Sequence, residues 1–180
     1  MKRLAALACL GACLMLAGCS ETHAGGDSAA VTPLDAAAIE AGVISDPMAI
    51  DLAGSFADTG GAGSDAFCAR GNRDQGYSVG ILVSFGGSSQ CEGQGRAALS
   101  GERVRISLTR NAAGDAVKDC SFTARFDGSA LALAGKLPAS CQALCSSRAS
   151  LAGASFALVE TGDRAAGAAR GRAITRLCGN

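Results

Sequence analysis

One stretch of the chain, Gly76-Tyr77-Ser78-Val79-Gly80, matches the G-x-S-x-G pattern of a serine hydrolase. In that chemistry the serine lies on a strand-to-helix turn, and a downstream histidine removes its proton. The single histidine of the chain is His23, which precedes the serine, and the residues after Gly80 continue as Ile-Leu-Val-Ser-Phe. We therefore interpret Ser78 as an outward-facing strand residue, and we predict that the protein is not an enzyme. A serine hydrolase that uses Ser78 is the remaining alternative.

Two further stretches resemble cofactor or metal motifs. Residues 93–98 fit the G-x-G-x-x-A form of a dinucleotide fingerprint, but that fingerprint functions only between a strand and a helix, and Leu99-Ser100-Gly101 ends the segment at once. Residues 58–65 form an acidic glycine-rich loop that lacks the alternating ligands and the distal glutamate of an EF-hand. We therefore predict neither a cofactor nor a bound metal.

Cysteine is the remaining residue type with reactive chemistry, and the chain has nine. The C-x-x-x-C spacing of Cys141 and Cys145 differs from that of thiol oxidoreductases, and no second pair has zinc-ribbon spacing. Six cysteines after residue 60 therefore predict up to three structural disulfides. Their spacing leaves several pairings open. The pairing we favour joins Cys141 and Cys145 to the strand cysteines Cys91 and Cys120, and Cys68 to Cys178.

The N-terminus reads as an export signal. Lys2 and Arg3 precede an uncharged apolar run from Leu4 to Leu16, which is too short to span a bilayer. The following Leu16-Ala17-Gly18-Cys19 resembles the lipobox of bacterial lipoproteins at all four positions. This resemblance implies that residues 1–18 are a signal peptide, that Cys19 carries a diacylglycerol and that the new N-terminus is acylated. Because serine and not aspartate follows Cys19, it also implies a periplasm-facing place on the outer membrane.

Charge divides the predicted mature chain into two parts. Residues 19–66 hold eight acidic residues and no lysine or arginine, whereas residues 67–180 hold eight acidic and 14 basic residues. The zero net charge of the whole chain argues against nucleic acid as a partner. Besides the membrane, reached through the lipid, the expected partner is an envelope protein or an anionic glycan or lipid that meets a cationic face. Solubility is the simpler explanation of the same charges.

The segment 19–66 is expected to be an acidic tether with one short helix. Thr32 is a suitable N-cap, Pro33 suits the first helical position, and Gly42 can end the helix. Residues 45–66 are rich in glycine and read as a loop.

The segment 67–160 predicts a mainly β domain. Strand-like residues occur at 77–85, 92–100, 104–109, 120–126, 130–134 and 155–160, with turns at Gly101 and Asp127-Gly128. Short strands at this spacing indicate a small antiparallel meander, closed as a barrel or packed as a sandwich, with disulfides. Pro138 is expected to start a helical turn that brings Cys141 and Cys145 to one face. Residues 161–180 are expected to be helical or loose, because glycines weaken the helical composition there.

With lipobox, tether and cysteine-stapled domain, the chain resembles small, uncharacterised proteobacterial envelope lipoproteins. The residues that carry this resemblance are Phe67-Cys68, the strands with Cys91 and Cys120, and Leu137-Pro138-Ala139-Ser140-Cys141 followed by Cys145. By size and location the chain is also similar to the membrane-bound inhibitors of c-type lysozyme, although it has no copy of their Ser-Gly…Tyr inhibitory pattern. The expected function is a non-enzymatic, lipid-anchored binding or structural module. The alternative is an inhibitor of lysozyme-like cell-wall hydrolases.

Overall fold

The computed structural model describes residues 32–43, 46, 49–58, 65–146 and 148–179. The predicted signal peptide, Cys19, His23 and the stretch up to residue 31 lie outside the described residues. The short helix of the tether is confirmed as α1 (Pro33–Glu40). Thr32 and Asp35 form a reciprocal capping box, in which Asp35 N–H donates to Thr32 Oγ1 at 3.1 Å and Thr32 N–H donates to Asp35 Oδ2 at 3.0 Å.

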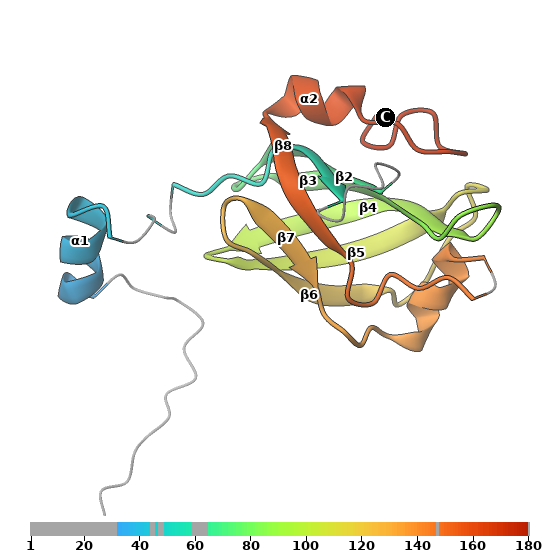
Figure 1. Cartoon of the computed structure of the whole chain (residues 1–180), viewed down its shortest axis with the longest axis horizontal. Helices are drawn as coiled ribbons and strands as arrows, with labels where there is room; N and C mark the ends of the chain where they lie inside the picture. The colour runs from blue at the N-terminus through green and yellow to red at the C-terminus, as the bar shows by residue number, and fades with distance from the viewer. Residues whose placement is uncertain (1–31, 44–45, 47–48, 59–64, 147, 180) are drawn as a thin grey trace, which may run out of the picture. The chain divides into compact units, whose positions relative to one another are not determined.

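The β domain is a closed antiparallel barrel of eight strands (Figure 1). The strands are β1 (Gly54–Asp58), β2 (Ala66–Asn72), β3 (Gly76–Ser84), β4 (Gln90–Ser100), β5 (Arg103–Asn111), β6 (Ser121–Phe126), β7 (Ala130–Leu133) and β8 (Ser155–Thr161). Each strand pairs with its neighbours in the sequence, and β8 closes the barrel on β1. The prediction of a mainly β meander is therefore confirmed, and of its two variants the barrel is the one adopted.

The barrel begins earlier than the sequence indicated. The sequence predicts that the β domain starts at residue 67 and that residues 45–66 form a loop, but β1 lies inside that segment. Its five residues contain one large apolar side chain, Phe56, so no alternation could be detected. Gly54 marks a close approach of two strands, because a side chain there would overlap the carbonyl oxygen of Glu160 on β8.

The interior of the barrel is filled by side chains. The inward residues of all eight strands form one apolar cluster, with four phenylalanines near its centre. The ring of Phe56 lies edge-on to Phe67 and Phe126, with centroids 5.4 and 5.7 Å away, and Phe67 contacts Phe156 at 5.9 Å. Eight strands enclose just enough space for such a core. A ligand would therefore bind to the outside of this barrel.

Both ends of the barrel are covered. At the end that holds the β3–β4 turn, the 3₁₀ helix η1 (Ala139–Leu144) contributes Cys141 and Leu144 to the core. At the opposite end, residues 50–53 cross the opening and bury Leu52 completely. Arg73 Nη2 fixes this crossing by donating to the carbonyl oxygen of Ile50 at 2.6 Å.

The six paired cysteines attach the covering segments to the strands. The disulfide Cys91–Cys145 joins β4 to the residue after η1, and Cys120–Cys141 joins η1 to the residue that precedes β6. The third disulfide, Cys68–Cys178, ties the C-terminal segment to β2. All three agree with the favoured pairing, and Pro138 does precede a helical turn, although Cys141 and Cys145 reach different strands.

Tyr77 lies at the end closed by residues 50–53 and has an unusual environment. The side chain is 0 % exposed, and its hydroxyl donates a hydrogen bond to Asp51 Oδ1 at 2.7 Å. Burial, followed by this hydrogen bond and the charge of Asp51, raises the pKa of Tyr77 to about 12. The unfolded value is about 10. The stability that the protonated phenol contributes is therefore fully present below about pH 10 and is lost as the pH rises through about 12.

We expect a titration of the folded protein to show this pKa directly. Tyr77 is the only tyrosine and the chain has no tryptophan, so tyrosinate absorbance reports on one residue. The midpoint should lie near 12 in the folded protein and near 10 in denaturant, as in model peptides. In Tyr77→Phe the loss of stability at alkaline pH should be smaller. An ordinary midpoint in the folded protein would show that the phenol is solvated.

Candidate functional site

Ser78 does not lie in the geometry of a nucleophile elbow. It is the third residue of β3, outside the barrel core, paired with Arg70 on one side and Arg96 on the other. The strand continues for six residues after it, where the motif needs a turn into a helix. The fingerprint-like residues 93–98 likewise lie within β4, and the strand leads into β5 without a helix. The residues of both motifs therefore form parts of regular β-strands.

The C-terminal segment, residues 162–179, is bound to the outside of the barrel, and we refer to it as the strap. It begins with α2 (Asp163–Ala168) and continues without helix across the outer side of β2–β4 (Figure 1). The helical stretch is thus shorter than its composition suggested, and the rest is held in place. Leu177 and Cys178 are buried against Cys68 and Leu82.

A glycine in β3 allows the strap to pack this closely against the barrel. Leu177 lies directly over Gly80 of β3, where any side chain would overlap the Leu177 carbonyl. The strap is thus seated on the strand backbone itself. The second glycine of the G-x-S-x-G pattern is therefore explained by packing.

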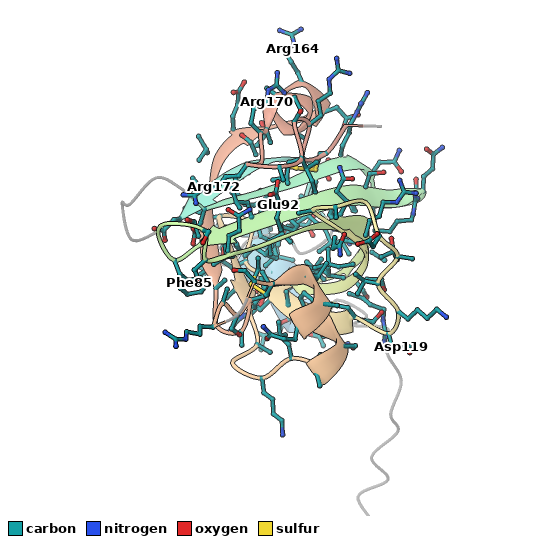
Figure 2. All side chains as sticks on the ribbon, turned by 90° about the vertical axis from the view of Figure 1, so that its right-hand side faces the viewer. Phe85, Glu92, Asp119, Arg164, Arg170 and Arg172 are labelled. Carbon is teal, nitrogen blue, oxygen red and sulfur yellow. A yellow bond between two sulfur atoms is a disulfide. The ribbon has the colours of Figure 1, made fainter. Side chains whose placement is uncertain are left out.

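Glu92 on β4 fixes the middle of the strap. Its side chain is completely buried beneath the strap, beside Arg172 (Figure 2). The carboxylate accepts hydrogen bonds from the backbone N–H groups of Ala173 at 3.0 Å and Ile174 at 2.8 Å, and from Gln90 Nε2 at 3.2 Å. Three donors replace the water that the buried charge has lost. The buried carboxylate therefore serves to hold the strap.

Side-chain amides and guanidinium groups fix the two ends of the same stretch. Gln94 Nε2 donates to the carbonyl oxygens of Arg176 at 3.1 Å and Leu177 at 3.0 Å. Arg172 Nη1 donates to the carbonyl oxygen of Gly87 at 3.1 Å. The strap is therefore a fixed wall on the outer surface of the barrel.

The outer surface of β2–β6 is rich in arginine. These strands contain one acidic residue, Glu92, which is buried, and six arginines, all exposed: Arg70, Arg96, Arg103, Arg105, Arg110 and Arg125. Arg125 forms an ion pair with Glu102 of the β4–β5 turn at 3.0 Å. We call the outer surface of these strands the arginine face. The strap adds further arginines above it, including Arg164 and Arg170 (Figure 2).

The strand register mixes hydroxyl groups with the arginines. Arg70, Ser78, Arg96, Ser107 and Ser121 follow one another across β2–β6 as direct neighbours. Guanidinium and hydroxyl groups both donate hydrogen bonds, and the guanidinium fork matches the oxygens of a carboxylate or phosphate. The arginine face is therefore chemically suited to anions.

A β-bulge in β5 adds one more arginine to this face. Gln94 pairs with Arg110 and Gly95 with Leu108, so Thr109 has no partner of its own on β4. In a regular strand Arg110 would point inward with Leu108, but after the bulge Thr109 and Arg110 are both exposed. A side chain at Gly95 would overlap the backbone of β5, so glycine is required there.

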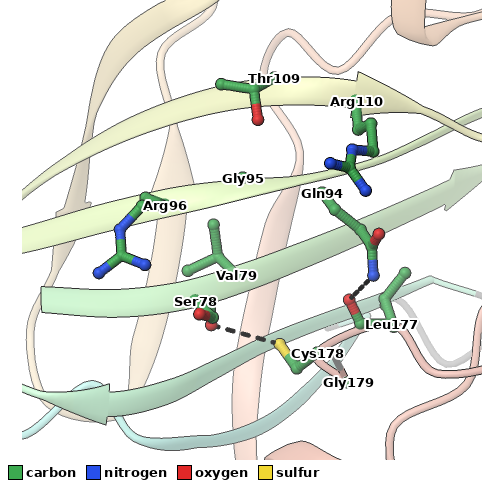
Figure 3. A pocket seen from close by; sticks show the side chains of 10 residues that line it. All are labelled: Ser78, Val79, Gln94, Gly95, Arg96, Thr109, Arg110, Leu177, Cys178 and Gly179. Carbon is green, nitrogen blue, oxygen red and sulfur yellow. Dashed lines mark hydrogen bonds between the residues drawn. The ribbon is translucent and has the colours of Figure 1, made fainter. Parts of the chain in front are cut away.

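A groove of about 390 Å³ opens beside the bulge. Its walls come from β3, β4, β5 and residues 177–179 of the strap, and Arg96 and Arg110 lie at opposite ends (Figure 3). Ser78 and Thr109 contribute hydroxyl groups. Sequence reasoning missed this groove, although glycines inside a strand at positions 93 and 95 are a known sign of a bulge.

The described residues contain no group of three or more histidine, cysteine or carboxylate side chains that could hold a metal. Within the same part of the chain, no helix has the length and apolar character needed to cross a bilayer. Comparison with known proteins finds no matching family model, curated protein or solved structure.

Proposed function

We propose that this protein is a lipid-anchored, non-enzymatic component of a Gram-negative envelope, facing the periplasm from the outer membrane. Its barrel binds an anionic glycan or lipid of the envelope through the arginine face. The observation that carries the binding role is the charge distribution on β2–β6, with six exposed arginines and one buried acid. The filled interior supports it further, because it leaves the outer surface for recognition.

A lysozyme inhibitor would use a similar small, disulfide-bearing barrel. However, lysozymes of the c type are cationic, and like charges across an interface oppose association. The arginine face thus favours an anionic partner over a cationic enzyme. Unchanged lysozyme activity in the presence of excess protein is the expected result.

The anchor rests on the lipobox and has its own test. We expect the protein isolated from a Gram-negative membrane to begin at Cys19 and to carry the mass of acyl chains there. Two or more chains hold a protein stably on a bilayer. The Cys19→Ala variant should lose these chains and leave the membrane fraction. An unmodified Cys19 in the processed protein would contradict the anchor.

The binding role is tested on the full chain carrying Cys19→Ala, so that the lipid cannot mediate attachment. We expect co-sedimentation with vesicles of anionic phospholipid but not with zwitterionic vesicles, and we expect salt to weaken it. In this background Arg96→Gln with Arg105→Gln should weaken binding. The control, Lys136→Gln with Arg148→Gln, removes the same charge away from the arginine face. Equal losses in both double variants would contradict a dedicated face.

A further inference from the structure

We propose that the groove beside the strap is a binding site for a phosphorylated sugar, with the phosphate held between Arg96 and Arg110. This inference rests on the proposed function and assigns its ligand to one site. The ten residues that line the groove include two arginines and no acidic residue. A bound anion would therefore meet donors without a competing carboxylate in the wall.

Arg110 is the first element of the site. The bulge directs it outward, although its position in β5 would otherwise direct it into the core. Its guanidinium makes no hydrogen bond or ion pair with another described residue, so its five N–H donors are available to a ligand. Most other arginines of the strands already occupy outward-facing positions and need no bulge to reach the surface.

Arg96 completes the pair. Its Nη2 donates to the carbonyl oxygen of Gln75 at 3.2 Å, which orients the guanidinium and leaves its other donors available. Because Gln94 is the partner of Arg110, Arg96 and Arg110 are diagonal neighbours on β4 and β5, with positions roughly 7–8 Å apart. Two long arginine side chains that start from neighbouring positions can turn both guanidinium groups toward one anion, and two positive charges suit the double charge of a phosphate monoester better than a single carboxylate charge.

The rest of the groove favours a sugar attached to that phosphate. A volume of about 390 Å³ is near the lower end of known ligand pockets, which hold small molecules. Ser78 and Thr109 supply hydroxyl groups, and Gln94 uses its Nε2 on the strap while its Oε1 accepts nothing from a described residue. Donors and acceptors together match the hydroxyl groups of a sugar.

Calorimetry with the full chain carrying Cys19→Ala tests the site. We expect glucose 1-phosphate to bind, and inorganic phosphate and glucose to bind more weakly. Arg110→Gln and Arg96→Gln should each weaken binding of glucose 1-phosphate by about tenfold or more, as expected for lost charge-assisted hydrogen bonds. Arg148→Gln is the matched control, since it removes one exposed arginine that lies outside the arginine face and does not line the groove, and it should change affinity less than about twofold.

A second experiment distinguishes a free sugar phosphate from the phosphorylated headgroup of a lipid. Vesicles with a phosphorylated glycolipid, compared with the same glycolipid without phosphate, show whether the sugar belongs to a lipid headgroup. Arg110-dependent binding in either arm supports the site. Equal losses in Arg148→Gln and Arg110→Gln would overturn it, as would equal binding of glucose and glucose 1-phosphate. Anionic vesicles that bind while neither glucose 1-phosphate nor the phosphorylated glycolipid binds through Arg110 would overturn the site and leave the proposed function intact, whereas no binding in any arm would overturn both.

Discussion

Replacing Cys68 and Cys178 together by alanine is expected to lower the free energy of unfolding by about 5 kcal/mol. This disulfide spans 110 residues, the longest separation of the three. A longer loop restricts the unfolded chain more, so its removal restores more conformational entropy to the unfolded state. Urea unfolding of the oxidised protein, followed by far-ultraviolet circular dichroism, measures the loss.

The matched control removes the shortest loop. Cys120 and Cys141 are 21 residues apart, and their joint replacement by alanine should cost about 3 kcal/mol on the same scale. Each double variant removes one disulfide and places two alanines at buried positions, so the two variants differ mainly in the length of the loop that is opened. If the short-loop variant were the less stable of the two, the prediction that the Cys68–Cys178 disulfide contributes more to stability would be wrong.

The second large effect is expected for Glu92→Ala. The substitution leaves the N–H groups of Ala173 and Ile174 without their acceptor in a buried place. Lost hydrogen bonds to a charged group cost about 1.5–3 kcal/mol, so we expect a loss of about 3 kcal/mol, limited by how far the strap opens to water. Amide hydrogen exchange should quicken at these two residues, while amides in the β6 centre stay protected.

Two variants make this prediction specific. Glu92→Gln keeps the size of the side chain but presents one acceptor oxygen where the carboxylate has two, so its loss should be intermediate. Glu102→Ala removes the exposed partner of Arg125 and should cost less than about 1 kcal/mol. Unchanged exchange at Ala173 and Ile174 in Glu92→Ala would show that the strap does not depend on the carboxylate.

The long strands of the barrel could be predicted because apolar and polar residues alternate within each continuous stretch of sequence. In β5, Val104, Ile106 and Leu108 are buried and the residues between them are more exposed. The turn between β4 and β5 was also readable, since Gly101 adopts a φ of 57°, a conformation that glycine takes easily. Local patterns of this kind need no knowledge of distant residues.

The features that build the candidate site depend on distant residues and could not be read locally. Gly80 is small because Leu177 lies on it, and Glu92 is buried because a strap some 80 positions later covers it. The bulge that turns Arg110 outward depends on the pairing of β4 with β5. The basic character of the segment after residue 67 was visible in the sequence, but its gathering on one face required the closed barrel.

Amide chemical shifts of the isotope-labelled full chain with Cys19→Ala, titrated with glucose 1-phosphate, test the central claim most directly. The claim is that recognition takes place on the arginine face, in the groove beside the strap. It predicts that the largest shifts occur at Ser78, Gln94, Arg96, Thr109 and Arg110. Largest shifts on β7 and β8, at the far side of the barrel, or equal shifts at all exposed arginines would contradict it.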